Sequence, residues 1–203
     1  MTLARLRSTA PAALLMVLAA CVPARPPASA TPSVDEENLV LAAVIRNLAS
    51  DSKSGAWAVS TRTIAVSWEN GLPPKKFRRQ WGVHISDEAL EDLVGPRAAT
   101  AVDIPTQVGA GTGVRWLSPD DTEAFERIPH DPRNWRARVD KVFPGLRSLT
   151  YPSRPGFTRD GRRAVVRMES DCGPLCGGGS LLTLRRGRDG TWTVDGSMVL
   201  TIA

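Results

Sequence analysis

The sequence predicts an α+β fold in which N-terminal helices pack on a C-terminal antiparallel β-meander. Two observations support this prediction. Apolar residues recur at helical spacing in several segments between residues 35 and 143, and short strand-like runs separated by turn residues follow from residue 162 onward. The chain is long enough for one domain with a hydrophobic core. We expect that domain to span residues 34–203, with its C-terminal sheet at about 162–203.

The first expected element is a helix over residues 35–50. Its first turn carries three acids, which a helix N-terminus favours: Asp35, Glu36 and Glu37. Its apolar stripe is predicted to contain Leu39, Ala43 and Leu48, widened by Val40, Val44 and Ile45. A strand is expected next, at residues 61–68, because apolar side chains alternate there at Ile64, Val66 and Trp68.

Further helices are expected in the middle of the chain. A short helix is predicted at residues 73–82, and a better one at 86–95, with Ser86 as its cap and Gly95-Pro96 as its stop. Residues 97–113 predict no element beyond a strand around 101–104. Two more helices, at 118–128 and 131–143, each begin with a capping residue followed by proline. In the last of them, one apolar face is formed by Trp135, Val139 and Val142.

In the last forty or so residues, the pattern of apolar residues changes from that of helices to that of strands. Four runs are predicted as strands: 162–169, 180–186, 191–194 and 197–202. They are separated by a cysteine loop, by the turn Gly187–Gly190, and by the dipeptide Asp195-Gly196, a frequent hairpin turn. Consecutive strands with such connections form an antiparallel meander, and we expect the helices to cover one of its faces.

Residues 1–20 have the features of a secretory signal. Arg5 and Arg7 precede an apolar run that ends at Cys21, and this run is shorter than the roughly 20 residues of a membrane-spanning helix. Leu18, Ala19, Ala20 and Cys21 resemble the lipobox of bacterial lipoproteins. The resemblance implies that Cys21 is acylated and becomes the N-terminus, so that its lipid anchors the protein to a membrane. The alternative is an ordinary signal cleaved after residues 28–30, with Cys21 removed.

The expected location is the cell envelope. In the lipoproteins that the lipobox resembles, Val22 after the cysteine implies the periplasmic face of the outer membrane. Residues 21–33 are rich in proline and alanine and predict a tether between anchor and domain. No nucleic-acid partner is expected there. Arginines cluster at Arg185–Arg188, where a solvated turn explains them as well as an anion site does.

The segment "SDCGPLCGGGS", residues 170–180, is the most distinctive part of the sequence. A thioredoxin-like redox centre needs two residues between its cysteines at a helix N-terminus, whereas three separate Cys172 from Cys176 and glycines follow. A metal site needs further ligands, but the two histidines, His84 and His130, have no partner at ligand spacing. A phosphate loop would lead into a helix. A disulfide fits best, because these cysteines form an even pair in an oxidising compartment once Cys21 is acylated.

The C-terminal third resembles a block in uncharacterised exported bacterial proteins, "SRxGF … CGxLCGxG … W", over about 50 residues. The matching positions are Ser153, Arg154, Gly156, Phe157, Ala164, Val165, Cys172, Gly173, Leu175, Cys176, Gly177, Gly179, Leu184, Gly190 and Trp192. The chain departs from this block after the loop, where "SLLTL" replaces an aromatic strand. The resemblance implies an exported domain and no particular activity.

Three functions are compatible with these features. The first is a non-catalytic lipoprotein that binds another envelope protein or a cell-wall component through the disulfide-shaped loop. The loop residues expected to form its surface are Asp171, Gly173, Pro174, Leu175, Gly177, Gly178 and Gly179. The second is an enzyme with a pocket lined by residues such as Arg154, Asp160 and Asp171, and the third is a thiol-disulfide protein. No cofactor or metal motif is present in the sequence.

Overall fold

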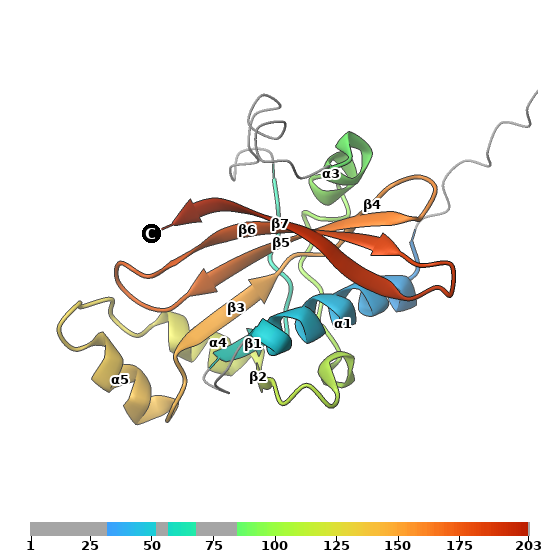
Figure 1. Cartoon of the computed structure of the whole chain (residues 1–203). Helices are drawn as coiled ribbons and strands as arrows, with labels where there is room; N and C mark the ends of the chain where they lie inside the picture. The colour runs from blue at the N-terminus through green and yellow to red at the C-terminus, as the bar shows by residue number, and fades with distance from the viewer. Residues whose placement is uncertain (1–31, 52–56, 68–84, 203) are drawn as a thin grey trace, which may run out of the picture.

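The computed structural model describes residues 32–51, 57–67 and 85–202. The predicted helix at 73–82, Trp68, His84, Cys21, the signal and the tether as far as residue 31 lie outside these residues. The described residues form four α-helices, one short 3-10 helix and a mixed sheet of seven strands, with the antiparallel meander at the C-terminal end (Figure 1). The predicted α+β class, with helices packed on that meander, is confirmed.

The helices begin close to where their capping signals predict. Their bounds are α1 Val34–Asp51, α3 Asp87–Leu93, α4 Pro119–Glu126 and α5 Trp135–Val142, with the 3-10 helix η2 at Thr106–Gly109. Ser118 caps α4, since its Oγ accepts a hydrogen bond from the Asp121 backbone N–H at 3.1 Å. Ser86 precedes α3 without a side-chain cap bond, and α5 starts four residues later than predicted.

The sheet joins strands from both halves of the chain. The strands are β1 Trp57–Ser60, β2 Arg115–Leu117, β3 Ser148–Pro152, β4 Gly156–Phe157, β5 Arg163–Asp171, β6 Gly177–Arg186 and β7 Trp192–Ile202. Their order is β2-β1-β3-β5-β6-β7, with β4 paired to β5. β1 is parallel to β2 and β3, and the remaining pairs are antiparallel. The predicted meander therefore continues into a parallel edge that the sequence did not reveal.

The strand predicted at 61–68 is wrong. The strand lies earlier, at β1, and is followed only by isolated bridges from Arg62 to Asp103 and from Ile64 to Ser153. β1 pairs with strands on both sides, and its last three residues are all buried, so it lacks the alternation by which half-buried strands are recognised. The strand proposed at 101–104 reduces to the single bridge at Asp103.

The last two predicted strands are one strand, β7. The dipeptide Asp195-Gly196 forms an irregularity inside it rather than a turn, because Thr183 pairs with Gly196 while Leu184 pairs with Val194. Asp195 is thus the extra residue of a β-bulge, and its carboxylate accepts a hydrogen bond from Thr183 Oγ1 at 2.9 Å.

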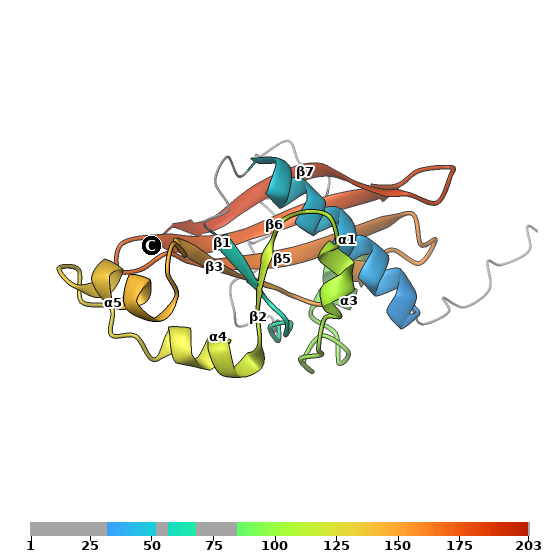
Figure 2. The ribbon, with the colours of Figure 1, turned by 90° about the horizontal axis from the view of Figure 1, so that it is seen from below.

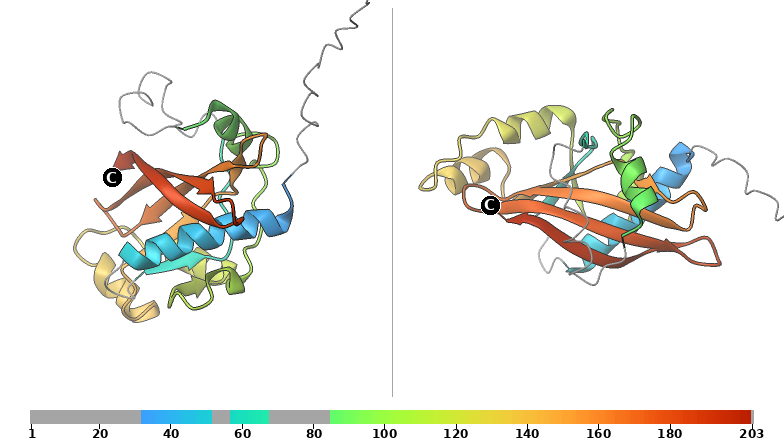
Figure 3. Two further views of the ribbon diagram at one scale, coloured as in Figure 1. Left: turned by 45° about the vertical axis from the view of Figure 1, so that its right-hand side comes forward. Right: turned by 90° about the horizontal axis from the view of Figure 1, so that it is seen from above.

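Helices cover both faces of the sheet, where one covered face was expected (Figure 2, Figure 3). On one face, Ala164, Val166 and Met168 of β5 share a core with Val40 and Val44 of α1. On the other face, Val165 packs with Leu90 and Leu93 of α3. α4 and α5 pack on this second face as well, against Ala58 of β1 and Leu149 of β3. Consecutive apolar residues in β5 require both layers, because alternate side chains point to opposite faces.

Burial confirms most of the predicted helix faces and corrects two residues in them. Leu39 of α1 and Val142 of α5 were expected in the core but are 51% and 53% exposed. The rest of the predicted stripe of α1 is confirmed at Val40, Ala43, Val44 and Ile45, which are buried together with Leu41. Trp135 is buried, as predicted, and Trp192 is buried as well.

The molecule has two distinct ends. The β4–β5 and β6–β7 turns lie at one end of the sheet, together with the first turn of α1, and the β5–β6 loop lies at the other (Figure 1). β5 runs between the two ends, and its nine residues span roughly 27 Å. None of the described helices combines the length and apolar character needed to cross a membrane.

Candidate functional site

The β5–β6 loop is closed by a disulfide between Cys172 and Cys176, whose Cα atoms are 5.1 Å apart. The Cys172 backbone N–H donates to the Cys176 carbonyl at 3.3 Å, and the Cys176 N–H donates to the Gly173 carbonyl at 3.0 Å. The loop is therefore cross-linked by its side chains and by its backbone. Both cysteines lie between strands, so neither has the helix N-terminus that lowers the thiol pKa in thioredoxin-like sites.

Leu175, at the loop tip, is unusual both in its exposure and in its backbone conformation. Its side chain is 86% exposed, and its φ of 63° is the one positive value among the described non-glycine residues. A left-handed conformation costs a residue with a Cβ about 1 to 2 kcal/mol. The loop thus presents a large apolar side chain to solvent from a strained backbone.

The base of the loop is fixed by residues before and at the start of α5. Asp171 accepts a hydrogen bond from the Gly173 N–H at 2.9 Å, and its other carboxylate oxygen lies 3.1 Å from His130 Nε2. The His130 ring stacks on Trp135, with 6.3 Å between centroids. A Cβ at Gly173 would lie 2.6 Å from the Trp135 ring, so only glycine fits there. Through these contacts, Asp171 and Gly173 fix the base of the loop. Contrary to the prediction from sequence, they do not form its outer surface.

A shallow groove of about 550 Å³ lies beside the loop. It is lined by Ser148, Ser170, Cys172, Leu175, Cys176, Gly177, Gly178, Gly179, Ser180, Val199 and Thr201. Leu175 and Val199 supply its apolar surface, and the serine and threonine residues supply hydroxyl groups. None of the lining side chains carries a charge, although 23% of the chain is charged. The groove can therefore bury an uncharged ligand without leaving a charge unpaired.

Gly177, Gly178 and Gly179 belong to β6 rather than to a flexible loop. A Cβ at Gly177 would lie 2.7 Å from the Ser170 carbonyl, and one at Gly179 would lie 3.2 Å from Thr201 Oγ1. Because these glycines carry no side chains, neighbouring strands can approach closely. For the same reason, no side chain fills this part of the groove. Pro174 is half-buried.

The residues named for an enzyme pocket do not meet. Arg154 is engaged with buried Glu37, its Nε lying 3.1 Å from Glu37 Oε2. Asp160 lies before β5 and Asp171 at its end, so roughly 27 Å of strand separates them. Hydrogen bonds from the Thr158 hydroxyl and the Arg162 backbone N–H lower the pKa of Asp160 and hold its carboxylate within its own turn.

The "SRxGF" segment has a structural explanation. Ser153 Oγ accepts a hydrogen bond from the Arg167 N–H at 2.9 Å, which ties the segment to β5. A Cβ at Gly156 would lie 2.1 Å from the Ala89 carbonyl, so α3 can pack only on a glycine. Phe157 meets Trp192 edge to face at 5.9 Å. The segment joins α1, α3 and the sheet.

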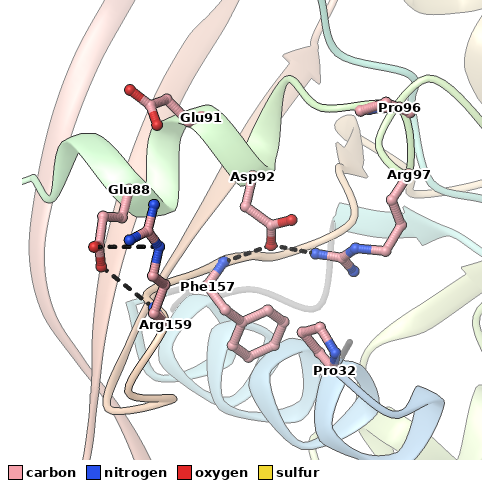
Figure 4. A pocket seen from close by; sticks show the side chains of 8 residues that line it. All are labelled: Pro32, Glu88, Glu91, Asp92, Pro96, Arg97, Phe157 and Arg159. Atoms are coloured by element: carbon pink, nitrogen blue, oxygen red, sulfur yellow. Dashed lines mark hydrogen bonds and ion pairs between the residues drawn. The ribbon is translucent and has the colours of Figure 1, made fainter. Parts of the chain in front are cut away.

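A second cavity, of about 430 Å³, lies beside this junction (Figure 4). Asp92 accepts a hydrogen bond from the Phe157 N–H and pairs with Arg97, while Glu88 pairs with Arg159 at 3.7 Å. Arg97 also pairs with Glu37 of α1. These charged groups are satisfied by one another, which indicates a role in holding α1 and α3 together.

A third cavity, of about 410 Å³, lies against α4 and contains Tyr151. Burial is the main cause that raises the pKa of Tyr151 above its usual value, and the charges of Glu126 and Asp171 raise it further. The phenol of the folded protein therefore stays protonated above the pH at which an exposed tyrosine ionises. Three acids of α4 line the same cavity: Asp120, Glu123 and Glu126. Sequence reasoning missed this site, since residues about 30 positions apart gave no local signal.

The described residues contain no group of three or more His, Cys, Asp or Glu side chains arranged to hold a metal ion. No protein-family model, curated protein or solved structure matches this chain. Function is therefore inferred from the disulfide loop and the groove beside it.

Proposed function

We propose that this protein is a non-catalytic, lipid-anchored protein of the cell envelope that binds another envelope protein or a cell-wall component through the Cys172–Cys176 loop. The observation that carries this proposal is the exposure of Leu175, 86%, at the tip of a cross-linked loop. Leu175 contributes little to the core, and its backbone is strained. Binding explains why an exposed apolar side chain is held there.

The construction of the loop favours binding. The disulfide, the Asp171–His130 pair and the contact of Gly173 with Trp135 fix the loop before a partner arrives. A pre-ordered loop loses less conformational entropy on association than a flexible one does. The uncharged groove beside Leu175 can then be covered with a small desolvation cost.

The proposed anchor is the lipid on Cys21, which the lipobox supports. The tether then lets the domain stand away from the bilayer, because residues 22–33 can extend over at most roughly 37 Å. Attachment through acyl chains is firm, since each buried methylene contributes about 0.8 kcal/mol. The described part of the chain is compatible with this arrangement, since α1 starts directly after the tether.

The test is site-specific photocrosslinking of the lipidated protein in its native envelope. A photoreactive leucine analogue at Leu175 should give a discrete crosslinked product that survives purification. The matched control is the same analogue at Val142, which is 53% exposed on α5. Equal products at both positions, or none at Leu175, would contradict the proposal.

A second variant separates binding from folding. Leu175→Gly removes the side chain and relieves the left-handed strain, so the free energy of unfolding should be unchanged or higher by about 1 kcal/mol. Retention of the partner found by crosslinking should nevertheless fall at least tenfold. A variant that retains the partner at full strength would show that Leu175 is not a binding residue.

A further inference from the structure

Six exposed arginines gather at the end of the sheet opposite the disulfide loop. They lie on the β4–β5 and β6–β7 turns and on the adjoining ends of β5 and β6, and are called the arginine end: Arg159, Arg162, Arg163, Arg185, Arg186 and Arg188. These two segments, residues 158–163 and 185–190, also contain Asp160 and Asp189, so their net charge is 6 − 2 = +4. The whole chain has a net charge of +5. Positive charge is therefore concentrated in these twelve residues.

The two turns lie side by side. Arg163 pairs directly with Arg185 across β5 and β6, and the Arg186 N–H donates to the Arg162 carbonyl at 2.9 Å. Like charges directly opposite each other destabilise a sheet. Arg163 and Arg185 therefore repel each other, and an acid at either position would remove this repulsion. Retention of both arginines is expected if their positive charge binds a partner.

The acids at this end leave half of the arginines unpaired. Asp189 accepts hydrogen bonds from the Thr191 hydroxyl and N–H, as Asp160 does within its own turn. Ion pairs within 4 Å occupy three arginines: Arg159 with Glu88, Arg163 with Asp195, and Arg186 with Glu36. Within the described parts of the chain, the other three have no carboxylate within that distance: Arg162, Arg185 and Arg188.

The arginine end lies where the chain leads toward Cys21. Glu36 in the first turn of α1 contacts both Arg186, at 3.4 Å, and Trp192 Nε1, at 2.8 Å. Pro32 is the first described residue and follows Cys21 by eleven positions, a reach of at most roughly 34 Å. Of the other acids in that turn, Glu37 is buried beneath Arg97 and Arg154, while Asp35 is exposed. The arginines therefore lie at the end of the domain from which the chain leads toward the proposed anchor.

We propose that the arginine end binds the phosphate groups of anionic lipids on the membrane surface. Guanidinium groups suit this partner because their planar donors match phosphate oxygens two at a time. A surface of many headgroups can engage all six side chains, whereas a single small anion cannot. Contact at this end would direct Leu175 away from the bilayer, since β5 separates the two ends by roughly 27 Å.

The experiment measures vesicle binding without the lipid anchor, so it does not depend on acylation of Cys21 or on the proposed function of the loop. The chain from Val22 onward keeps every packing contact described above, all of which lie within residues 32–202. Its partition is compared between vesicles of phosphatidylcholine and an equimolar mixture of phosphatidylcholine and phosphatidylglycerol. We expect binding to the mixture that weakens steeply with added salt.

The triple variant Arg162→Gln/Arg185→Gln/Arg188→Gln should weaken this partition about a hundredfold, since each basic residue near an anionic surface contributes about fivefold. The matched control removes three exposed arginines near the other end: Arg133→Gln/Arg138→Gln/Arg147→Gln. This control should weaken binding less than tenfold. Urea unfolding of both variants confirms that each remains folded.

Three results would overturn the proposal. Equal partition onto neutral vesicles would exclude an electrostatic surface. Equal weakening by the two triple variants would show a general effect of net charge. Displacement by inorganic phosphate at the concentration of lipid phosphate, with ionic strength matched by chloride, would show a single anion site rather than a membrane-binding surface.

Discussion

Leu175 and Glu37 each depart from the usual partition of side chains, in opposite directions. Leu175 is apolar and 86% exposed, whereas Glu37 is charged and 4% exposed. Glu37 is stabilised because Arg97 and Arg154, from two other segments, both pair with it. Leu175 has no such compensation among the residues that the structure describes. This contrast is why we attribute a structural role to Glu37 and a binding role to Leu175.

Tyr151 offers a test at the scale of one residue, because it is the single tyrosine of the chain. Its pKa is raised in the folded state, chiefly by burial, so the folded protein keeps its phenol proton where the unfolded chain loses it. Above about pH 10, the free energy of unfolding should therefore fall by up to about 1.4 kcal/mol per pH unit. Below about pH 10, Tyr151 should not make the free energy of unfolding depend on pH.

The measurement combines two readouts. Ultraviolet absorbance should show no tyrosinate in the native protein until alkaline unfolding begins. Urea unfolding of Tyr151→Phe should lack the part of the alkaline decline that the wild type shows. Free titration of the phenol near pH 10 in folded protein would show that Tyr151 is accessible to water.

The disulfide loop is the element whose stability can be estimated most directly. Its cross-link closes a ring of five residues, for which the loop-entropy model gives about 2 kcal/mol. The Cys172→Ser/Cys176→Ser variant should therefore fold, with its free energy of unfolding lowered by about that amount. Retention of a partner through Leu175 should fall much more, because the loop must then be ordered on binding.

Intact mass before and after reduction gives the control for this prediction. Reduction of the exported protein should add two hydrogens to the domain. Two freely titrating thiols in freshly isolated protein would contradict the disulfide. A readily reversible couple with an acidic thiol would instead support the thiol-disulfide alternative.

The elements that sequence predicted well are those with local signals. The cap before α4 and the strand-like runs of β5 and β6 are read within a few residues, and the structure places these elements close to their expected positions. β1 was displaced because its last three residues are all buried, and a strand buried on both faces loses the alternation that marks a half-buried strand. The bulge at Asp195 has the sequence of a turn, and only its pairing with β6 distinguishes the two.

The candidate site was only partly predictable for the same physical reason. The cysteine pair is local, and so its cross-link could be anticipated from spacing and number. The support beneath it is not local, because His130 and Trp135 reach Asp171 and Gly173 across about 40 positions. The arginine end likewise exists only because the sheet brings two turns together. Single arginines in turns give no such signal.

At the scale of the whole molecule, the two proposed surfaces lie at opposite ends of one sheet. The arginine end and the first turn of α1 lie together, and the disulfide loop lies beyond the full length of β5 (Figure 1). A protein held at the first end would present Leu175 away from its membrane. The Asp171–His130 contact and the core between β5 and α1 make the connection between the ends rigid.

This orientation depends on the anchor, and the final prediction concerns Cys21. Because a short apolar run ends in a lipobox, Cys21→Ser should abolish fatty-acid labelling of the protein and prevent the normal cleavage of its signal. The variant processed at another site should leave the membrane fraction in high salt, since the arginine end alone would hold it only by screened electrostatic attraction. The lipidated wild type should remain bound under the same conditions. A wild-type N-terminus downstream of Ala30, with no change in fractionation on Cys21→Ser, would show that the segment is an ordinary secretory signal.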